Sequence, residues 1–281
     1  TNMKKNFFKG SLALLSLVLI TVLSCTKSED LSNNTVEPVA KTGQNIEIGN
    51  LTPDRVEVTG NMATVTFMQS ARLFTLNTDF TKGKEYLALL RNAIEKDIPV
   101  KVTVFANNTD IASVSPALED VVERYRELRS ASSEMQTRSS NTVIPNEREL
   151  IRLFNAVKLP SIPFAYAVDG CYARAHKMRQ VLVQNGYDCK KLFAYGSLAA
   201  STGTCCVRWG YHVAPQVDFR NSRGQIETRV FDPSLFPNGP VTQQAWLNAC
   251  RNKSCYSSTY ISSAKLTQGN VYVRSSNGRI I

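Results

Sequence analysis

Hydrophobic periodicity in the second half of the chain predicts a helix that begins near Cys171. Apolar residues recur at helical spacing from Ala175 to Leu182, and the pair Asn185-Gly186 that follows is a typical helix stop signal. Because Cys171 comes at the start of this periodic segment, its side chain is expected in the first helical turn.

Strand-like runs follow this helix, and another helix precedes it. The runs lie at residues 191–195, 206–219 and 226–231, and residues 221–224 have the composition of a hairpin turn. Asn146 is a predicted N-cap with Glu149 at the capping-box position, and Thr242 is predicted to cap a short helix. A helix, a cysteine-bearing helix and then antiparallel strands predict an α+β fold.

The first half of the chain predicts a smaller α+β unit. Residues 62–68 and 99–105 alternate as strands do, and residues 84–96 place apolar side chains on one helical face. Ser115-Pro116 is expected to cap and start a further helix. After Cys25 this unit contains neither cysteine nor histidine, so we expect no catalytic groups in it.

The N-terminus has the pattern of an export signal. Three lysines precede an apolar run at residues 12–23, which is short for a membrane span and typical of a signal peptide. The run ends in Leu-Ser-Cys at Cys25, which resembles a lipobox. We predict that residues 1–25 are a signal peptide and that the protein is secreted or is an outer-membrane lipoprotein attached through lipidated Cys25. Ordinary secretion with Cys25 removed is the alternative.

Two polar segments divide the rest of the chain. Residues 26–50 lack periodicity and predict a flexible tether. Residues 129–141 are rich in serine and contain Arg129 and Arg138, which predicts an exposed linker open to proteolysis. We therefore expect a small unit over residues 51–138 and a second unit over residues 139–281.

Charge differs between these two parts. Residues 1–138 contain 16 basic and 16 acidic residues, so the formal net charge of +10 lies in residues 139–281. A basic surface can attract acidic polypeptides or keep a protein in solution. Neither a basic helix nor an aromatic stacking motif accompanies the charge, so we expect no nucleic-acid partner.

Cys171 is the candidate nucleophile. Unpaired backbone N–H groups and the helix dipole favour a thiolate at the start of a helix. A buried structural cysteine or one half of a disulfide is the alternative. A nucleophilic cysteine needs a nearby base. His176 lies five residues further along the same helix, about 140° around its axis, so His212 on a later strand is the better candidate.

Asp232 is the candidate group that orients the histidine. It follows the apolar run 226–231, next to the predicted strand that carries His212, and side chains on neighbouring strands come within hydrogen-bonding distance. A turn formed by Asp232-Pro233 is the alternative. Asp169, two residues before Cys171, is a second acidic candidate that would shape the turn or contact substrate.

The remaining cysteines favour disulfides over a metal site. Structural zinc sites need Cys or His in closely spaced pairs, and Cys205-Cys206 are adjacent instead. We expect no metal and no cofactor. Cys250 is expected to pair with Cys255, and Cys189 with Cys205 or Cys206, which leaves one thiol unpaired.

Several gap-free blocks resemble the bacterial protein-glutaminase family, whose members are secreted protein-glutamine deamidases. The blocks are Val168–Gln180, Asn185–Cys189, Ala200–Cys206, Tyr211–Val213, Asp232–Phe236 and Gly239–Thr242. The resemblance runs from about residue 143 to residue 274. It implies that Cys171, His212 and Asp232 are the catalytic residues of a core similar to transglutaminases and to papain.

The first half resembles the pro-region of that family more loosely, at Val65–Met68 and Leu89–Arg91. The resemblance implies that residues 51–138 are an inhibitory pro-region, with the piece around Ser70–Leu73 lying in the cleft as a pseudo-substrate. The family's cysteine pair before the nucleophile has no counterpart at residues 159–167, so its disulfide pairing is not carried over.

The expected activity is hydrolysis of the glutamine side-chain amide in proteins or peptides, through a cysteine thioester, to glutamate and ammonia. A transglutaminase, a cysteine protease with the same three residues, and a non-enzymatic surface module held together by disulfides are the alternatives. The expected partners are glutamine-bearing polypeptides and the chain's own pro-region, and the chain is expected to be a monomer.

Overall fold

The computed structural model describes residues 45–106, 109–135, 142–202 and 205–281. The predicted signal peptide, Cys25 and most of the predicted tether lie outside these ranges. The elements of residues 45–135 are β1 (Ile46–Leu51), β2 (Pro53–Thr59), β3 (Met62–Phe67), β4 (Ser70–Asn77), α1 (Gly83–Lys96), β5 (Val100–Val104), β6 (Ile111–Pro116) and α2 (Glu119–Met135). Those of residues 142–281 are α3 (Glu147–Ala156), α4 (Cys171–Gln184), β7 (Lys190–Ser201), β8 (Cys206–Arg220), β9 (Ile226–Val230), α5 (Gln243–Cys250) and β10 (Tyr260–Gln268).

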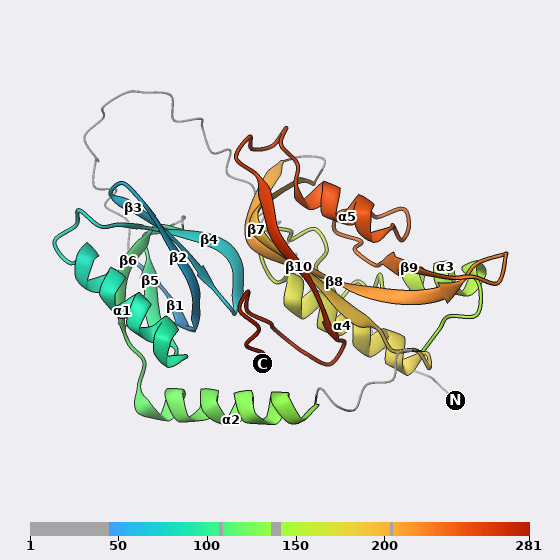
Figure 1. Cartoon of the computed structure of the whole chain (residues 1–281), viewed down its shortest axis with the longest axis horizontal. Coiled ribbons are helices and arrows are strands. Elements are labelled where there is room, and N and C mark those ends of the chain that lie inside the picture. The colour runs from blue at the N-terminus through green and yellow to red at the C-terminus, as the bar shows by residue number, and fades with distance from the viewer. Residues whose placement is uncertain (1–44, 107–108, 136–141, 203–204) are drawn as a thin grey trace, which may run out of the picture.

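Three antiparallel sheets build the described part of the chain. The N-terminal unit, defined here as residues 45–135, contains sheets of order β1-β5-β6 and β2-β3-β4. The C-terminal unit, residues 142–281, contains one sheet of order β10-β7-β8-β9. The two units lie side by side in Figure 1, where α2 runs below both and β4 extends to the C-terminal sheet and packs against β8. The predicted α+β class is confirmed.

Each unit has its own hydrophobic core. The core of the N-terminal unit lies between its strands and α1, around Phe67, Phe74 and Leu90. The C-terminal unit has two hydrophobic clusters. One contains residues of α3 and α4, and the other lies around Cys171 and the C-terminal sheet. Among the described members of this second cluster, Ala71 of β4 is the one residue from the N-terminal unit. The N-terminal unit therefore contributes a buried side chain to the cluster that contains the residue expected to be the nucleophile.

Helix α4 begins and ends where the hydrophobic pattern predicts. Gly170 precedes it with φ of 77°, a left-handed conformation that glycine adopts without a steric penalty. At the other end, Asn185 is the C-cap and Gly186 has φ of 85°. The positive φ of Gly170 turns the chain sharply, which places Cys171 in the first turn of the helix.

The predicted strands and the two caps of the C-terminal unit are also found. Strands β7, β8 and β9 cover the three strand-like runs, and Gly224 closes the hairpin between the last two with φ of 77°. The side chains of Asn146 and Thr242 accept the backbone N–H bonds of Glu149 and Ala245. Each carboxylate oxygen of Glu149 accepts a hydrogen bond from the Arg152 guanidinium.

Three boundary predictions are wrong. The chain expected to be a tether up to residue 50 already forms β1 from Ile46, because this segment pairs with β5 and packs Ile48 against the N-terminal core. Ser115-Pro116 ends β6, which pairs with β5, and the next helix starts at Glu119. Residues 129–135 of the expected linker belong to α2. The rest of that linker, including Arg138 and the predicted boundary at residue 138, lies outside the described residues.

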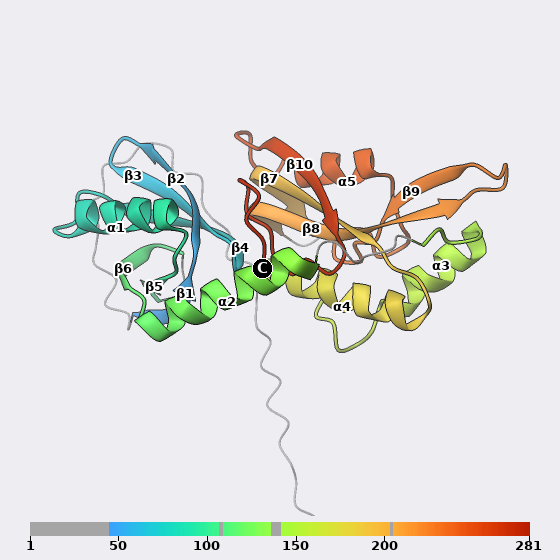
Figure 2. The same cartoon turned by 60° about the horizontal axis from the view of Figure 1, so that its bottom comes forward.

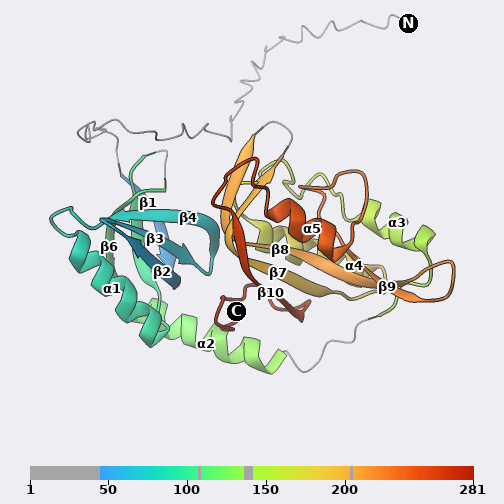
Figure 3. The same cartoon turned by 45° about the horizontal axis from the view of Figure 1, so that its top comes forward.

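Strand β10 is an element that the periodicity does not predict, and a short tail follows it. Residues 271–281 fold back on themselves through a bridge between Arg274 and Ile280. The Tyr195 hydroxyl donates to the Arg274 carbonyl at 2.8 Å, and the buried Lys191 ammonium donates to the Val271 carbonyl at 2.6 Å. Figures 2 and 3 show the C-terminus between the two units, next to α2. Two side chains of β7 thus fix the start of the tail.

None of the helices in the described ranges is long and apolar enough to cross a membrane.

Candidate active site

The loop before α4 is fixed by a buried arginine and an aspartate. Arg174 is 4% exposed, and its Nη1 donates to the carbonyls of Tyr166 and Asp169, at 2.7 Å each. The Asp169 carboxylate accepts the Gly170 backbone N–H at 2.7 Å. These bonds hold the chain on both sides of the turn, so the position of the Cys171 thiol is set by the loop as well as by the helix. Sequence reasoning did not find Arg174, whose position in the helix carries no distinctive pattern.

The Cys171 thiol is buried and neutral in this structure. Burial raises its pKa to about 12, although the nearby Arg174 guanidinium and a hydrogen bond from the Val213 backbone N–H act in the opposite direction. The helix-start argument predicts a thiolate, and here the loss of solvent outweighs it. A thiol of this kind is unreactive at neutral pH as long as the site stays closed.

His212 and Asp232 are brought together as the strand arrangement predicts. His212 lies on β8, and its Nε2 is 2.7 Å from Asp232 Oδ2, just after β9. Both side chains are buried, at 1% and 4% exposure. Burial alone would raise the pKa of Asp232, but the charge and hydrogen bond of His212 and a hydrogen bond from Trp246 outweigh burial, so the pKa lies below its ordinary value.

The second ring nitrogen of His212 is available. Nδ1 is buried and has no hydrogen-bond partner within the described residues. With Nε2–H donated to the carboxylate, Nδ1 carries the lone pair that a general base needs. No hydrogen bond joins Cys171 to His212 in the part of the chain that the structure describes, but the thiol contacts Val213, the residue after His212.

Two tryptophans hold the His212 ring. The Trp209 ring is stacked on it with centroids 4.5 Å apart, and the Trp246 ring is stacked at 5.4 Å. The Trp246 indole N–H also donates to Asp232 Oδ2 at 2.8 Å, the oxygen that bonds His212. Trp246 therefore contacts both members of the pair. Periodicity marks such a residue only as part of the α5 core, so sequence reasoning missed this role.

Asp169 contacts the N-terminal unit. Its carboxylate accepts the Ser70 hydroxyl at 2.6 Å and the Ala71 backbone N–H at 2.9 Å. Ala71 itself packs in the cluster that contains Cys171. Strand β4 thus begins next to Cys171, the candidate nucleophile, and beside an acidic residue of the loop that precedes it. Of the two roles considered for Asp169, the bond to the Gly170 N–H shows that it shapes the turn, and contact with substrate stays a prediction.

His176 lies away from the site, as its helical position predicts. Its Nδ1 is 3.4 Å from Lys191 Nζ, and its ring packs against Tyr272. Burial and the neighbouring Lys191 charge lower its pKa to about 4. A histidine that is neutral at physiological pH and packed under the C-terminal tail is a structural residue.

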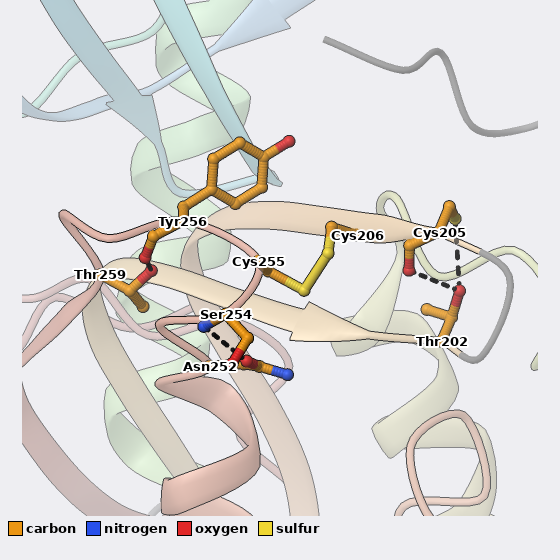
Figure 4. The surroundings of a disulfide bond; sticks show 8 residues. All are labelled: Thr202, Cys205, Cys206, Asn252, Ser254, Cys255, Tyr256 and Thr259. Carbon is orange, nitrogen blue, oxygen red and sulfur yellow. Dashed lines mark hydrogen bonds between the residues drawn. A yellow bond between two sulfur atoms is a disulfide. The ribbon is translucent and has the colours of Figure 1, made fainter. Parts of the chain in front are cut away.

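The disulfide prediction is wrong in its pairing. Cys206, at the start of β8, bonds Cys255 in the loop between α5 and β10 (Figure 4). Cys189 and Cys250 are free and buried. The register decides this, because β7 pairs with β8 so that Cys206 lies at the sheet end where the residue 252–259 loop returns. Sequence spacing alone does not show which loop reaches that end.

Within the described residues no group of three or more His, Cys, Asp or Glu side chains could hold a metal ion.

Comparisons with known proteins identify one family. A family model described as glutaminase (Gln_deamidase_2) matches residues 150–250. The crystal structure of pro-protein-glutaminase is 40% identical, with a TM-score of 0.77, and the match covers 84% of this chain and 87% of that one. A mutant of pro-protein-glutaminase matches at the same identity and TM-score over 85% of this chain and 88% of that one.

Protein-glutaminase from Chryseobacterium proteolyticum is 53% identical to this chain, with a TM-score of 0.48. The match covers 50% of this chain and 82% of that one. No curated protein matches the chain. The matches to the pro-form extend over both units, with identity well above the level at which only the fold is shared. The chain therefore belongs to the protein-glutaminase family, and both of its units share the fold of the pro-form.

Proposed function

We propose that this chain is the secreted zymogen of a protein-glutamine deamidase. The freed C-terminal unit would hydrolyse the side-chain amide of glutamine in proteins or peptides to glutamate and ammonia. Membership of the protein-glutaminase family supports the reaction, and the likeness to its pro-form over both units supports the zymogen. The observation that carries the assignment of residues is the buried 2.7 Å His212–Asp232 bond, which leaves the other ring nitrogen without a hydrogen-bond partner in the described part of the chain.

The first half of the reaction needs a thiolate. Once the site is open, His212 Nδ1 takes the Cys171 proton and the sulfur attacks the carboxamide carbon of glutamine. Backbone N–H groups at the start of α4 stabilise the negative oxygen of the tetrahedral intermediate. The imidazolium then gives its proton to the leaving nitrogen, so that ammonia departs and a thioester remains on Cys171.

The second half is hydrolysis of that thioester. With ammonia gone, His212 removes a proton from water, which attacks the thioester carbonyl, and the sulfur leaves as the thiolate that recovers the proton. Asp232 keeps Nε2 protonated, so that Nδ1 serves as base in each half. A core similar to transglutaminases and to papain would use the same three groups.

The N-terminal unit is proposed to act as the inhibitory pro-region. Ala71 packs against the cluster around Cys171, and its methyl group offers no amide for the thiol to attack. The Ala71 backbone N–H binds Asp169 as a backbone N–H of an extended substrate would, and the Ser70 side-chain hydroxyl binds the other carboxylate oxygen. Further contacts close the site: the Tyr211 hydroxyl donates to the Met68 carbonyl at 2.9 Å, and a Cβ on Gly210 would come within 2.5 Å of the Thr66 methyl.

The test identifies the products. The chain is cleaved within residues 136–141, the N-terminal fragment is removed under mild denaturant, and casein is added with a labelled primary amine. A deamidase releases ammonia and converts glutamine to glutamate, with little label in the protein. Label incorporation would instead show a transglutaminase, and new peptides a protease. Cys171→Ala should abolish ammonia release, and equal release by that variant would remove Cys171 from the mechanism.

A further inference from the structure

A cluster of charged residues joins the two units at the C-terminal tail, separately from the contacts at the nucleophile. We call this cluster the tail clasp; it consists of Asp54, Asp97, Arg129, Ser276, Arg279 and the Ile280 carbonyl. Arg279 Nη1 is 2.6 Å from Asp97 Oδ1, and its Nη2 donates to the Pro53 carbonyl at 3.0 Å. The Ser276 backbone N–H lies 3.1 Å from Asp54 Oδ2.

Asp97 is the centre of the tail clasp. One carboxylate oxygen accepts the Tyr125 hydroxyl at 2.8 Å as well as Arg279, and the other lies 2.8 Å from Arg129 Nη2. Arg129 in turn donates to the Ile280 carbonyl at 2.9 Å. Asp97 has φ of 50°, the one positive φ of a non-glycine residue within the described ranges. This conformation is uncommon outside glycine, and it places the carboxylate at the end of α1, where it faces the tail.

The tail side of the clasp is built as a fixed surface. Lys191 and Tyr195 of β7 hold the carbonyls of Val271 and Arg274, and the Ser275 hydroxyl accepts the Arg279 backbone N–H at 2.8 Å. The Arg279 side chain is 10% exposed and that of Asp54 is 8% exposed. Partly buried ion pairs of this kind are screened by salt much less than surface pairs.

We propose that the tail is a second docking surface for the pro-region, which keeps the pro-region bound after the linker has been cut. This inference rests on the proposed function. Asp54, Asp97 and Arg129 all precede residues 136–141, so a cut there leaves them on the pro-region, while Ser276, Arg279 and Ile280 stay with the enzyme. Cleavage then gives a non-covalent complex, and activity appears only when the pro-region dissociates or is degraded.

The experiment measures how tightly the cut pro-region is held. A specific protease site is placed within residues 136–141 of the full chain, the purified protein is cut, and the dissociation constant of the two fragments is measured by serial dilution and size-exclusion chromatography. Asp97→Asn keeps the size of the side chain, and asparagine tolerates a positive φ. Arg279→Lys keeps the charge but lacks the guanidinium fork that reaches Asp97 and Pro53 together.

Each variant should raise the dissociation constant about ten- to a hundredfold, the range expected when hydrogen bonds to charged groups are lost. The matched control is Arg220→Gln. Arg220 is exposed, and its guanidinium donates to the Gly224 carbonyl within its own hairpin. It should leave the constant unchanged. The thermal midpoint of each intact variant checks that both units still fold.

Equal dissociation constants for the parent and both clasp variants would overturn the proposal, and so would fragments of the parent that separate at the highest concentration used. Ammonia release is read separately on the isolated C-terminal fragment. A fragment without that activity would count against the proposed function, and the dissociation constants would still decide whether the tail clasp holds the pro-region.

Discussion

His212 has the most constrained surroundings of any side chain at the site. Its ring is stacked on Trp209 and Trp246, one nitrogen is bonded to Asp232, and the other has no hydrogen-bond partner among the described residues. Flat apolar partners restrict rotation of the imidazole without competing for its nitrogens. The ring is thus held in one orientation and one tautomer before substrate arrives.

Trp246→Phe should lower kcat of the freed enzyme about tenfold, because it removes one charge-assisted hydrogen bond from Asp232 and keeps an aromatic ring over His212. The matched variant is Trp209→Phe, whose lost N–H bond goes to the Ala167 carbonyl. The measurement is kcat of each freed variant. Trp209→Phe should leave kcat close to that of the parent, because it removes no hydrogen bond from Asp232. An equal loss of kcat in both variants would contradict this role.

Cys171 should react with iodoacetamide only after the pro-region leaves. With a pKa of about 12, nearly all of the thiol is protonated at pH 8 in the intact chain, and thiolate is the reactive form. Opening the site removes the burial that raises the pKa, so the rate should increase and its midpoint should move to lower pH. Peptide mapping by mass spectrometry reports each cysteine separately.

Cys189 is the internal control for this measurement. It is equally buried, with a pKa raised to about 12, but lies in the cluster under α3 and α4. It should stay unmodified before and after release. Alkylation of Cys171 at the same rate in the intact chain and the freed enzyme would show that the pro-region does not close the site.

The sequence predicts the positions of some residues at the candidate site and misses others. Helical geometry correctly separated His176 from Cys171, and strand adjacency correctly brought His212 next to Asp232. Their catalytic roles remain predictions. Trp246 and Arg174 could not be found in this way. A tryptophan in a short helix is ordinarily a core residue, and an arginine in an amphipathic helix is ordinarily a surface residue. What distinguishes them is a contact made across the fold.

Helices and strands with strong local signals could be predicted, and those that depend on a partner could not. Helix α4 has a glycine turn before it and a stop after it, and β8 and β9 share a short turn. Strand β10 reads Tyr-Ile-Ser-Ser-Ala-Lys-Leu-Thr-Gln, with weak alternation, and is held by pairing with β7. Strand β1 likewise forms at the edge of its sheet, where it pairs with the central strand β5.

The Cys206–Cys255 disulfide ties the first residue of β8 to the loop that precedes β10 (Figure 4). It closes a loop of 49 residues, so replacing both cysteines by serine should lower the free energy of unfolding by roughly 2–4 kcal/mol. Chemical denaturation of the variant and of the parent, both without reductant, is the measurement. A variant as stable as the oxidised parent would show that this bond does not support the sheet.

Two sets of contacts join the two folded units in the described part of the chain. One lies around Cys171, where Ser70 and Ala71 bind Asp169, and the other is the tail clasp around Asp97 and Arg279. The charge distribution of the sequence is consistent with this division, since the positive charge lies in the C-terminal unit and the pro-region supplies both clasp carboxylates. A latent enzyme needs its inhibitor to be held firmly and yet removable. Anchoring at two separate places would meet both needs.

The most direct test of the proposed deamidase activity is ammonia release from a glutamine-rich protein, compared with release from free glutamine. It is measured before and after proteolysis within residues 136–141 and removal of the pro-region. We expect low release by the intact chain and high release by the freed enzyme, with protein strongly preferred over free glutamine and no release by Cys171→Ala. Equal turnover by the intact and freed forms would contradict inhibition by the pro-region. A freed enzyme that releases no ammonia from any glutamine-bearing protein would contradict the proposed protein-glutamine deamidase activity.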